Sequence, residues 1–323
     1  MAVVQTVRGP VDTSELGTTL MHEHVFVLTA DVRHNYPGEW DEPARVADAT
    51  ARLAELRGVG VDTIVDPTVV GLGRDIPLIR QVCEQVDLNV VVATGVYTYQ
   101  DVPFYFRFRG PGVAPNLPDP MVDMFVADIT EGIAGTGVRA GLLKCAIDEP
   151  GMTPGVERVM RAVARAHRLT GVPVTVHTHP GSRTGLLVRQ VFDEEGVDPR
   201  RVVLGHSGDS TDADHLSDLA ESGFLLGMDR FGLDLELSSA DRVGIVVELV
   251  RRGHVGQLVL SHDASCHLDW VDPALLSALP NWNYLHLHNH VLPELRAQGI
   301  TDEQIQQMLV DNPRRYFEFT GGY

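Results

Sequence analysis

Apolar, β-branched runs alternate along the chain with segments in which apolar residues recur at helical spacing. The first kind of segment favours buried strands, and the second favours helices packed against them. The predicted strands cover residues 19–27, 63–66, 89–95, 140–147, 172–177, 202–206, 224–228 and 257–261. The predicted helices cover residues 43–57, 75–85, 121–132, 155–170, 184–195, 212–222, 239–252 and 301–316. Residues 3–11 predict a small hairpin, and residues 30–41 predict a polar loop.

The regular alternation of strand and helix predicts a parallel sheet, because parallel neighbours need a crossover helix between them. Eight such units predict an α/β fold of the closed (β/α)₈ TIM barrel type, with a single domain over residues 1–323. An open, doubly wound sheet is the alternative. It is disfavoured because no glycine-rich phosphate-binding motif follows the first predicted strand.

The longest predicted loop, residues 96–120, is rich in proline and aromatic residues. A loop of this length within a barrel is either a poorly ordered excursion or part of a functional site, and the aromatic content favours function. Its aromatic residues are Tyr97, Tyr99, Phe104, Tyr105, Phe106 and Phe108.

The charge balance narrows the possible partners. The formal net charge of −18 opposes binding to nucleic-acid phosphates or anionic membranes, so we expect a small-molecule substrate and neither of those partners. Three cysteines without a short-range spacing argue against a disulfide framework. The first residues show no signal-peptide pattern, and no apolar run approaches the length of a membrane span. We therefore expect a cytoplasmic protein.

Metal-ligand side chains recur where the predicted strands end, the edge at which such barrels build their active sites. Alternation along a strand turns His22 and His24 to one face. Further nitrogen and oxygen donors follow at His177, His206 and Asp263. This donor set suits zinc, manganese, iron or cobalt. Because it is too large for one tetrahedral ion, it favours two divalent metal ions.

Lys144 lies among these strand ends but cannot bind a metal as an ammonium ion. A desolvated lysine loses its proton readily. The neutral amine can then add carbon dioxide and become a carbamate, whose two oxygens could bridge two metal ions. A simpler interpretation is a lysine whose charged end reaches out of the strand into solvent.

Two stretches resemble the signatures of the phosphotriesterase family of the amidohydrolase superfamily: GTTLMHEH at residues 17–24 and TGVPVTVH at residues 170–177. The resemblance extends over essentially the whole chain. It implies a (β/α)₈ barrel with a binuclear metal centre and a homodimer. His22, His24 and Asp263 would hold the more buried ion, His177 and His206 the more exposed one. Carboxylated Lys144 would bridge both, together with a hydroxide.

Tyr97 and Arg230 resemble positions that mark the phosphotriesterase-like lactonase branch, and Trp270 resembles a residue lining the lactone pocket. We therefore expect hydrolysis of N-acyl homoserine lactones, with weak phosphotriesterase activity. The bridging hydroxide would attack the carbonyl, and Asp263 would accept its proton. Tyr97 and Arg230 would orient the reacting groups. The expected substrate contacts are Tyr97, Tyr99, Arg230, Phe231 and Trp270.

Other functions remain as alternatives: a dedicated organophosphate phosphotriesterase, a hydrolase of cyclic amides or nucleobases, and a non-catalytic, metal-free barrel scaffold. The signatures argue against the amide and nucleobase hydrolases. Several further histidines are interpreted as structural or surface residues, and Cys266 could line the mouth of the pocket. The histidines set aside in this way are His167, His179, His215, His262, His286, His288 and His290.

Overall fold

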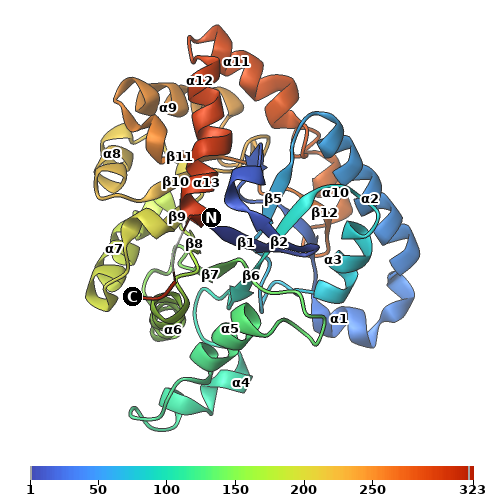
Figure 1. Ribbon diagram of the computed structural model, residues 1–323, viewed down its shortest axis with the longest axis vertical. Coiled ribbons are helices and arrows are strands. Elements are labelled where there is room, and N and C mark those ends of the chain that lie inside the picture. The colour runs from blue at the N-terminus through green and yellow to red at the C-terminus, as the bar shows by residue number, and fades with distance from the viewer. Residues whose placement is uncertain (1, 319–320) are drawn as a thin grey trace.

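Eight parallel strands form the central sheet of the computed structural model, which describes residues 2–318 and 321–323 (Figure 1). The strands follow one another in chain order. The sheet closes where the backbone N–H of Met21 donates to the carbonyl of Leu260 at 3.4 Å. The strands are β3 (Thr19–Leu20), β5 (Thr63–Asp66), β6 (Asn89–Gly95), β7 (Leu142–Ala146), β8 (Val174–His177), β9 (Val202–Gly205), β10 (Leu225–Met228) and β11 (Leu258–Leu260). The predicted (β/α)₈ TIM barrel is confirmed.

Helices surround this sheet and follow the predicted segments to within a few residues (Figure 1). Many begin at an aspartate, serine or threonine whose side chain accepts a backbone N–H, as at Asp41, Asp75 and Thr153. A proline in the first turn follows each of these three, where its missing N–H has no cost. The outer helices are α2 (Glu42–Gly58), α3 (Ile76–Cys83), α5 (Pro120–Thr130), α6 (Pro154–Thr170), α7 (Thr184–Glu195), α8 (Ala213–Glu221) and α9 (Ser239–Arg251).

The first predicted strand is wrong in one respect, because it is interrupted. Residues 19–27 form β3 and a separate strand, β4 (His24–Val27), with residues 21–23 between them. There the backbone bonds to both neighbours in the barrel: the N–H of Met21 donates to Leu260, and that of Glu23 donates to Val65. Strand β4 then pairs in parallel with β12 (Ser265–Leu268), which was not predicted.

The two long predicted loops contain short helices. Residues 30–41 include α1 (Ala30–Asn35), and residues 96–120 include α4 (Phe104–Arg107). After β12 the chain forms α10 (Pro273–Ser277). These turns are too short for hydrophobic periodicity to predict. The predicted N-terminal hairpin is present as β1 (Val3–Thr6) and β2 (Gly9–Asp12).

The C-terminal part contains two π-helical turns. One, Leu287–Val291, precedes α11 (Leu292–Ala297). The other, Gln307–Asp311, joins α12 (Asp302–Gln306) to α13 (Asn312–Phe317). In each case the second residue of the following helix is a proline. A proline inside a helix lacks a donor and clashes with an earlier carbonyl, and a widened turn relieves both problems.

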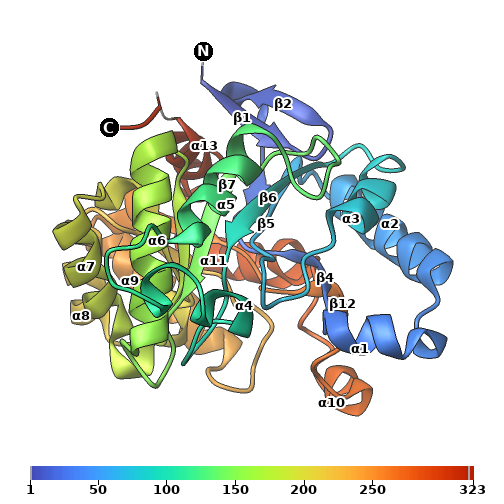
Figure 2. The same ribbon diagram turned by 90° about the horizontal axis from the view of Figure 1, so that it is seen from below.

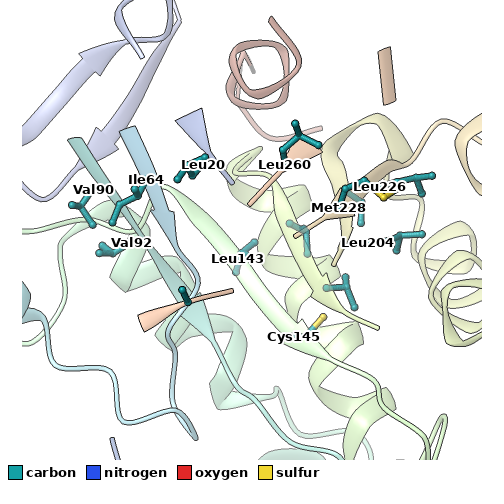
Figure 3. Packing of buried hydrophobic residues seen from close by; sticks show 14 of the residues in the cluster. Leu20, Ile64, Val90, Val92, Leu143, Cys145, Leu204, Leu226, Met228 and Leu260 are labelled. Carbon is teal, nitrogen blue, oxygen red and sulfur yellow. The ribbon is translucent and has the colours of Figure 1, made fainter. Parts of the chain in front are cut away.

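Alternation along the strands divides the core in two. One set of side chains packs between the barrel and its helices, including Ile64, Leu143 and Cys145 (Figure 3). The other set fills the barrel interior. Since Lys144 lies between Leu143 and Cys145, its side chain points to the opposite face, into the barrel.

Both chain ends lie at one end of the barrel, and α1, α4 and α10 lie at the other (Figure 2). Strands β4 and β12 also lie toward that second end. Among the described residues, no helix combines the length and the apolar character needed to cross a membrane.

Candidate metal centre

The strand-end residues singled out from the sequence surround one cavity of about 220 Å³. Lys144 comes from β7 and His177 ends β8, while His206 follows β9 directly and Asp263 follows β11. All the predicted ligands line the cavity: His22, His24, Lys144, His177, His206 and Asp263. The barrel thus brings together donors that are far apart in the sequence.

One group of donors meets at the carboxylate of Asp263. Its Oδ1 lies 3.4 Å from Nε2 of His22 and 3.2 Å from Nε2 of His24. The three side chains offer donor atoms that all lie within 4.8 Å of one another, close enough to hold one ion. Asp263 itself has a φ of 55°, in the left-handed region.

A second group is the pair His177 and His206. Nδ1 of His177 faces Nε2 of His206 at 2.8 Å. The other ring nitrogen of each histidine lies against a carboxylate: Nε2 of His177 against Asp148, and Nδ1 of His206 against Asp229. Each neutral histidine has one ring N–H. If it donates this N–H to its carboxylate, the two nitrogens that face each other both carry lone pairs. Two lone pairs at this separation repel each other unless a proton or a metal ion lies between them.

The same arrangement holds His22 and His24. Nδ1 of His22 lies 2.8 Å from Oδ2 of Asp229, and Nδ1 of His24 lies 2.7 Å from the hydroxyl of Thr68. The hydroxyl of Thr68 in turn donates to Asp66. Partners of this kind orient metal-binding imidazoles and raise their basicity.

These supporting residues were not assigned a role from the sequence. Asp66, Asp148 and Asp229 all lie at or just beyond strand ends, so their positions were visible in the pattern. What the pattern lacked was any indication of which histidine each carboxylate would contact.

Lys144 is fully buried, and its Nζ has no hydrogen-bond partner. Burial lowers the pKa of Lys144 to about 8, so a larger fraction of neutral amine is present near neutral pH than for an ordinary lysine. An unpartnered nitrogen inside a ring of metal-type donors fits the carboxylation chemistry that the sequence suggested, and it excludes a lysine that reaches out to solvent.

Most of the imidazoles are held in the neutral form that binds metals. Burial lowers the pKa of His177 to about 4 and also lowers the pKa values of His22 and His206. His24 differs: burial lowers its pKa, but hydrogen bonds to Asp263 and Asp66 outweigh that effect and raise the pKa to about 9. A proton on His24 then occupies the place that a cation would take.

Arg230, in the loop after β10, links the carboxylate of Asp263 to Asp209 in the loop after β9. Its Nε donates to Oδ2 of Asp263 at 3.0 Å, and its Nη1 donates to Asp209 at 2.8 Å. Burial lowers the pKa of Arg230, but the two carboxylates outweigh it and raise the pKa above its usual value. Arg230 therefore stays cationic and binds the oxygen of Asp263 that does not face His22 and His24.

The predicted aromatic contacts divide into two kinds. The hydroxyl of Tyr97 lies 3.2 Å from Nδ1 of His177 and also bonds to the hydroxyl of Tyr99. Tyr97, Tyr99 and Trp270 line the cavity. Phe231 does not: it is 1% exposed and packs in the hydrophobic core, so its position does not support a substrate contact. Leu233 and Trp282 line the cavity and were not predicted.

The histidines set aside from the sequence lie elsewhere. His262 points away from the cavity and contacts Glu23 at 2.6 Å. His179 accepts a hydrogen bond from Ser182 in the loop after β8. Among the described residues, the groups that could hold a metal include neither of these two, nor His286, His288 or His290. Cys266 is not among the cavity residues and contacts the hydroxyl of Tyr284.

Comparisons with known proteins agree with this geometry. The model of the phosphotriesterase family matches residues 2–317. A phosphotriesterase homology protein of Mycobacterium tuberculosis is 58% identical over 325 residues, which cover 100% of both chains. An aryldialkylphosphatase of Saccharolobus solfataricus is 37% identical over 313 residues, covering 96% of this chain and 98% of the other.

A solved structure, described as that of the phosphotriesterase from Mycobacterium tuberculosis, superimposes with a TM-score of 0.97. It is 58% identical and covers 99% of this chain and 100% of its own. Sequence, fold and donor set therefore agree, and the chain belongs to the phosphotriesterase family, whose enzymes are hydrolases with a binuclear metal centre.

Proposed function

We propose that this protein is a binuclear-metal lactonase that opens N-acyl homoserine lactones and hydrolyses phosphotriesters more slowly. The observation that carries the proposal is the convergence of two sets of metal-type donor atoms on one cavity. One set is Nε2 of His22, Nε2 of His24 and Oδ1 of Asp263, and the other is the facing nitrogens of His177 and His206. The unpartnered Nζ of Lys144 lies in the same cavity.

The donor chemistry fits two divalent ions such as zinc, cobalt, iron or manganese. His22, His24 and Asp263 would hold one ion, and His177 and His206 would hold the other. Carboxylated Lys144 would contribute an oxygen to each. When bound, such ions lower the pKa of water toward neutrality and polarise a carbonyl or phosphoryl oxygen.

Asp263 is the residue placed to move a proton. Its Oδ1 faces His22 and His24, while its Oδ2 accepts from Arg230. Asp263 would take the proton of the attacking water at Oδ2 and pass it to the alkoxide that leaves the opened ring. Arg230 would hold the carboxylate in place during this transfer, since both Asp263 and Asp209 fix its guanidinium.

Tyr97 is the neutral donor of the site. Burial raises the pKa of Tyr97 well above its ordinary value, so its hydroxyl keeps its proton. From its place 3.2 Å from His177, it can donate to the carbonyl oxygen or the ring oxygen of a lactone.

The lining of the cavity combines the metal-type donors with apolar side chains, which suits a neutral ester with an acyl chain. The apolar part of the lining consists of Val27, Leu72, Leu233, Leu268, Trp270, Val271 and Trp282. At about 220 Å³ the cavity is smaller than typical pockets for drug-sized ligands. It would enclose the lactone ring and its amide, and the acyl chain would extend over Trp270, which is 46% exposed.

A dedicated phosphotriesterase is the second candidate. It is favoured by the description of the relative from Saccharolobus solfataricus as an aryldialkylphosphatase and by that of the solved structure as a phosphotriesterase. Both reactions need an attacking water and a polarised oxygen, at a tetrahedral carbon in the lactone and at a five-coordinate phosphorus in the phosphotriester, so the ligand set alone does not separate them. The homodimer and the cytoplasmic location stay predictions.

Paired kinetics separate the two candidates. The protein, loaded with cobalt or zinc and checked for two ions per chain, is assayed on N-acyl homoserine lactones of increasing chain length and on a diethyl aryl phosphate. We expect kcat/KM for the preferred lactone to exceed that for the phosphate by about 100-fold or more. The reverse order would establish the dedicated phosphotriesterase, and inactivity on both with two ions bound would contradict both candidates.

A further inference from the structure

Glu23 lies between the two metal-type histidines in sequence but faces away from them. Alternation turns His22 and His24 into the cavity and Glu23 to the opposite side. Its side chain is 0% exposed. A buried carboxylate is costly unless several donors satisfy it, so its partners reveal what it holds.

Within the described part of the chain, the hydrogen-bond partners of the Glu23 carboxylate all belong to the segment that carries Asp263. Oε1 accepts from the hydroxyl of Ser261 at 3.2 Å and from the backbone N–H of His262 at 3.0 Å. Oε2 accepts from the backbone N–H of Ala264 at 3.1 Å. The carboxylate therefore holds the peptide groups on both sides of Asp263.

Asp263 needs such support because its backbone is strained. Its φ of 55° lies in the left-handed region, which side-chain-bearing residues rarely adopt. Its own N–H donates to the carbonyl of His22 at 3.0 Å, and the N–H of His24 donates to the carbonyl of Ala264 at 2.8 Å. The strained turn is thus tied to the His22–His24 segment from both directions, where β4 and β12 lie side by side (Figure 2).

His262 connects the Glu23 carboxylate and its bonds to residues 261–264 with the C-terminal part of the chain. Its Nδ1 lies 2.6 Å from Oε1 of Glu23, and its Nε2 accepts the backbone N–H of Leu287 at 2.9 Å. The second bond places the ring hydrogen on Nδ1, where it donates to Glu23. Trp282 adds a bond from its indole N–H to the carbonyl of His262 at 2.9 Å.

We propose that Glu23 and His262 form a positioning pair that sets Asp263 for metal binding and proton transfer. Glu23 touches neither the cavity nor a substrate. It acts by fixing the backbone on both sides of Asp263, so that Oδ1 meets the two histidines while Oδ2 stays on Arg230. The inference rests on the proposed metal centre but not on the choice between lactone and phosphotriester.

The test replaces the carboxylate with the isosteric amide. Glu23→Gln keeps one acceptor oxygen and turns an NH₂ group toward a backbone N–H. With both sites loaded with Co²⁺, release into excess chelator is followed by visible absorption. We expect one of two release phases to accelerate about 10-fold or more, while the other is unchanged. At saturating Co²⁺ we expect kcat to fall by about 10- to 100-fold with a much smaller change in KM.

The matched control is Asp119→Asn. Asp119 is also a buried carboxylate that accepts a backbone N–H, and it pairs with Arg158 away from the metal-type donors. We expect this control to lower thermal stability and to leave Co²⁺ release and kcat unchanged. Wild-type Co²⁺ release and wild-type kcat in Glu23→Gln would overturn the inference. A wild-type protein that bound no Co²⁺ would contradict the proposed function instead.

A second pair of variants tests the contact between His262 and Glu23 if Glu23→Gln does not fold. His262→Asn retains a side-chain N–H that can reach Glu23, whereas His262→Leu has none. We expect the asparagine variant to release Co²⁺ at the wild-type rate and the leucine variant to release it about 10-fold faster. Equal release rates in the two variants would overturn the role assigned to the pair.

Discussion

Lys144 shows how a single buried charge can lower the free energy of unfolding when no other group is bonded to it. Its ammonium group is fully buried, and its Nζ has no hydrogen-bond partner. Burial lowers the pKa of Lys144 from its ordinary value of 10.5 to about 8 and outweighs Asp263 and Asp229, which favour the charged form. Such a residue makes physical sense as a precursor of a metal-bridging carbamate.

Replacing Lys144 with methionine should therefore stabilise the metal-free protein. The fall in pKa from 10.5 to about 8 corresponds to about 3 kcal/mol in the free energy of unfolding at pH 7. Because the folded pKa lies below the unfolded one, the wild-type penalty is complete below pH 8 and fades as the pH rises toward 10.5.

Urea unfolding of both metal-free proteins between pH 7 and pH 10 measures this difference. The Lys144→Met variant should also fail to retain two ions. A variant that is no more stable than the wild type at pH 7 would show that Lys144 is solvated or paired.

Asp263 provides the second prediction at the residue scale. Asp263→Asn keeps the shape of the side chain but cannot accept a proton at neutral pH. Assayed at metal concentrations that fill both sites, it should lose about 100-fold or more in kcat. Metal content is measured on the same samples. Near wild-type turnover at full occupancy would remove Asp263 from proton transfer.

The sequence predicted the residues that face the cavity better than those that support them. His22, His177 and Asp263 stand at strand ends, so the fold alone brings them to one rim. The contacts of Glu23 with residues 261–264 join positions more than 200 apart, and no local pattern reveals such pairs. Phe231 follows Arg230, but its side chain is buried in the core. A loop has no regular periodicity, so its sequence does not indicate which way each side chain points.

Strand β6 shows how one element positions its neighbour. It ends at Gly95, which pairs in register with Lys144 on β7 and has a φ of 149°. A Cβ at Gly95 would lie 1.8 Å from the carbonyl oxygen of Lys144. The close approach of the two strands at the metal centre therefore requires glycine.

Gly95→Ala should lower the free energy of unfolding by more than about 1 kcal/mol and weaken metal binding, because β6 must move away from Lys144. Gly60→Ala is the matched control: its φ of 93° is also positive, but a Cβ there meets nothing within 4 Å. Thermal unfolding and Co²⁺ titration of both variants separate the cost of a positive φ from the clash of the new Cβ with the carbonyl oxygen of Lys144. Equal losses in the two would contradict the importance of the β6–β7 contact.

Regular strands and helices were predictable because each buries a periodic apolar face. The interruption between β3 and β4 was not, because apolar and β-branched residues flank His22, Glu23 and His24 on both sides, so residues 19–27 resemble one continuous strand. The break exists because the backbone of residues 21–23 bonds to strands on both sides, a property of the closed barrel. Strand β12 likewise depends on its partner β4 and has no independent pattern.

At the scale of the whole molecule, barrel closure turns a linear series of strand ends into one site. The donors lie at the carboxyl ends of the strands, where the chain between β11 and β12 meets the His22–His24 segment. A net charge of −18 does not prevent metal binding at this rim and favours the capture of cations. Residues from most of the barrel would thus hold the two cations together at this rim.

The most direct measurement is anomalous diffraction from crystals of the protein grown with Co²⁺ or Zn²⁺. We expect two peaks, one among His22, His24 and Asp263 and the other between His177 and His206, with electron density for a carboxyl group on Lys144 reaching both. A single peak, or none at these residues, together with an unmodified Lys144 turned away from the histidines, would contradict the account.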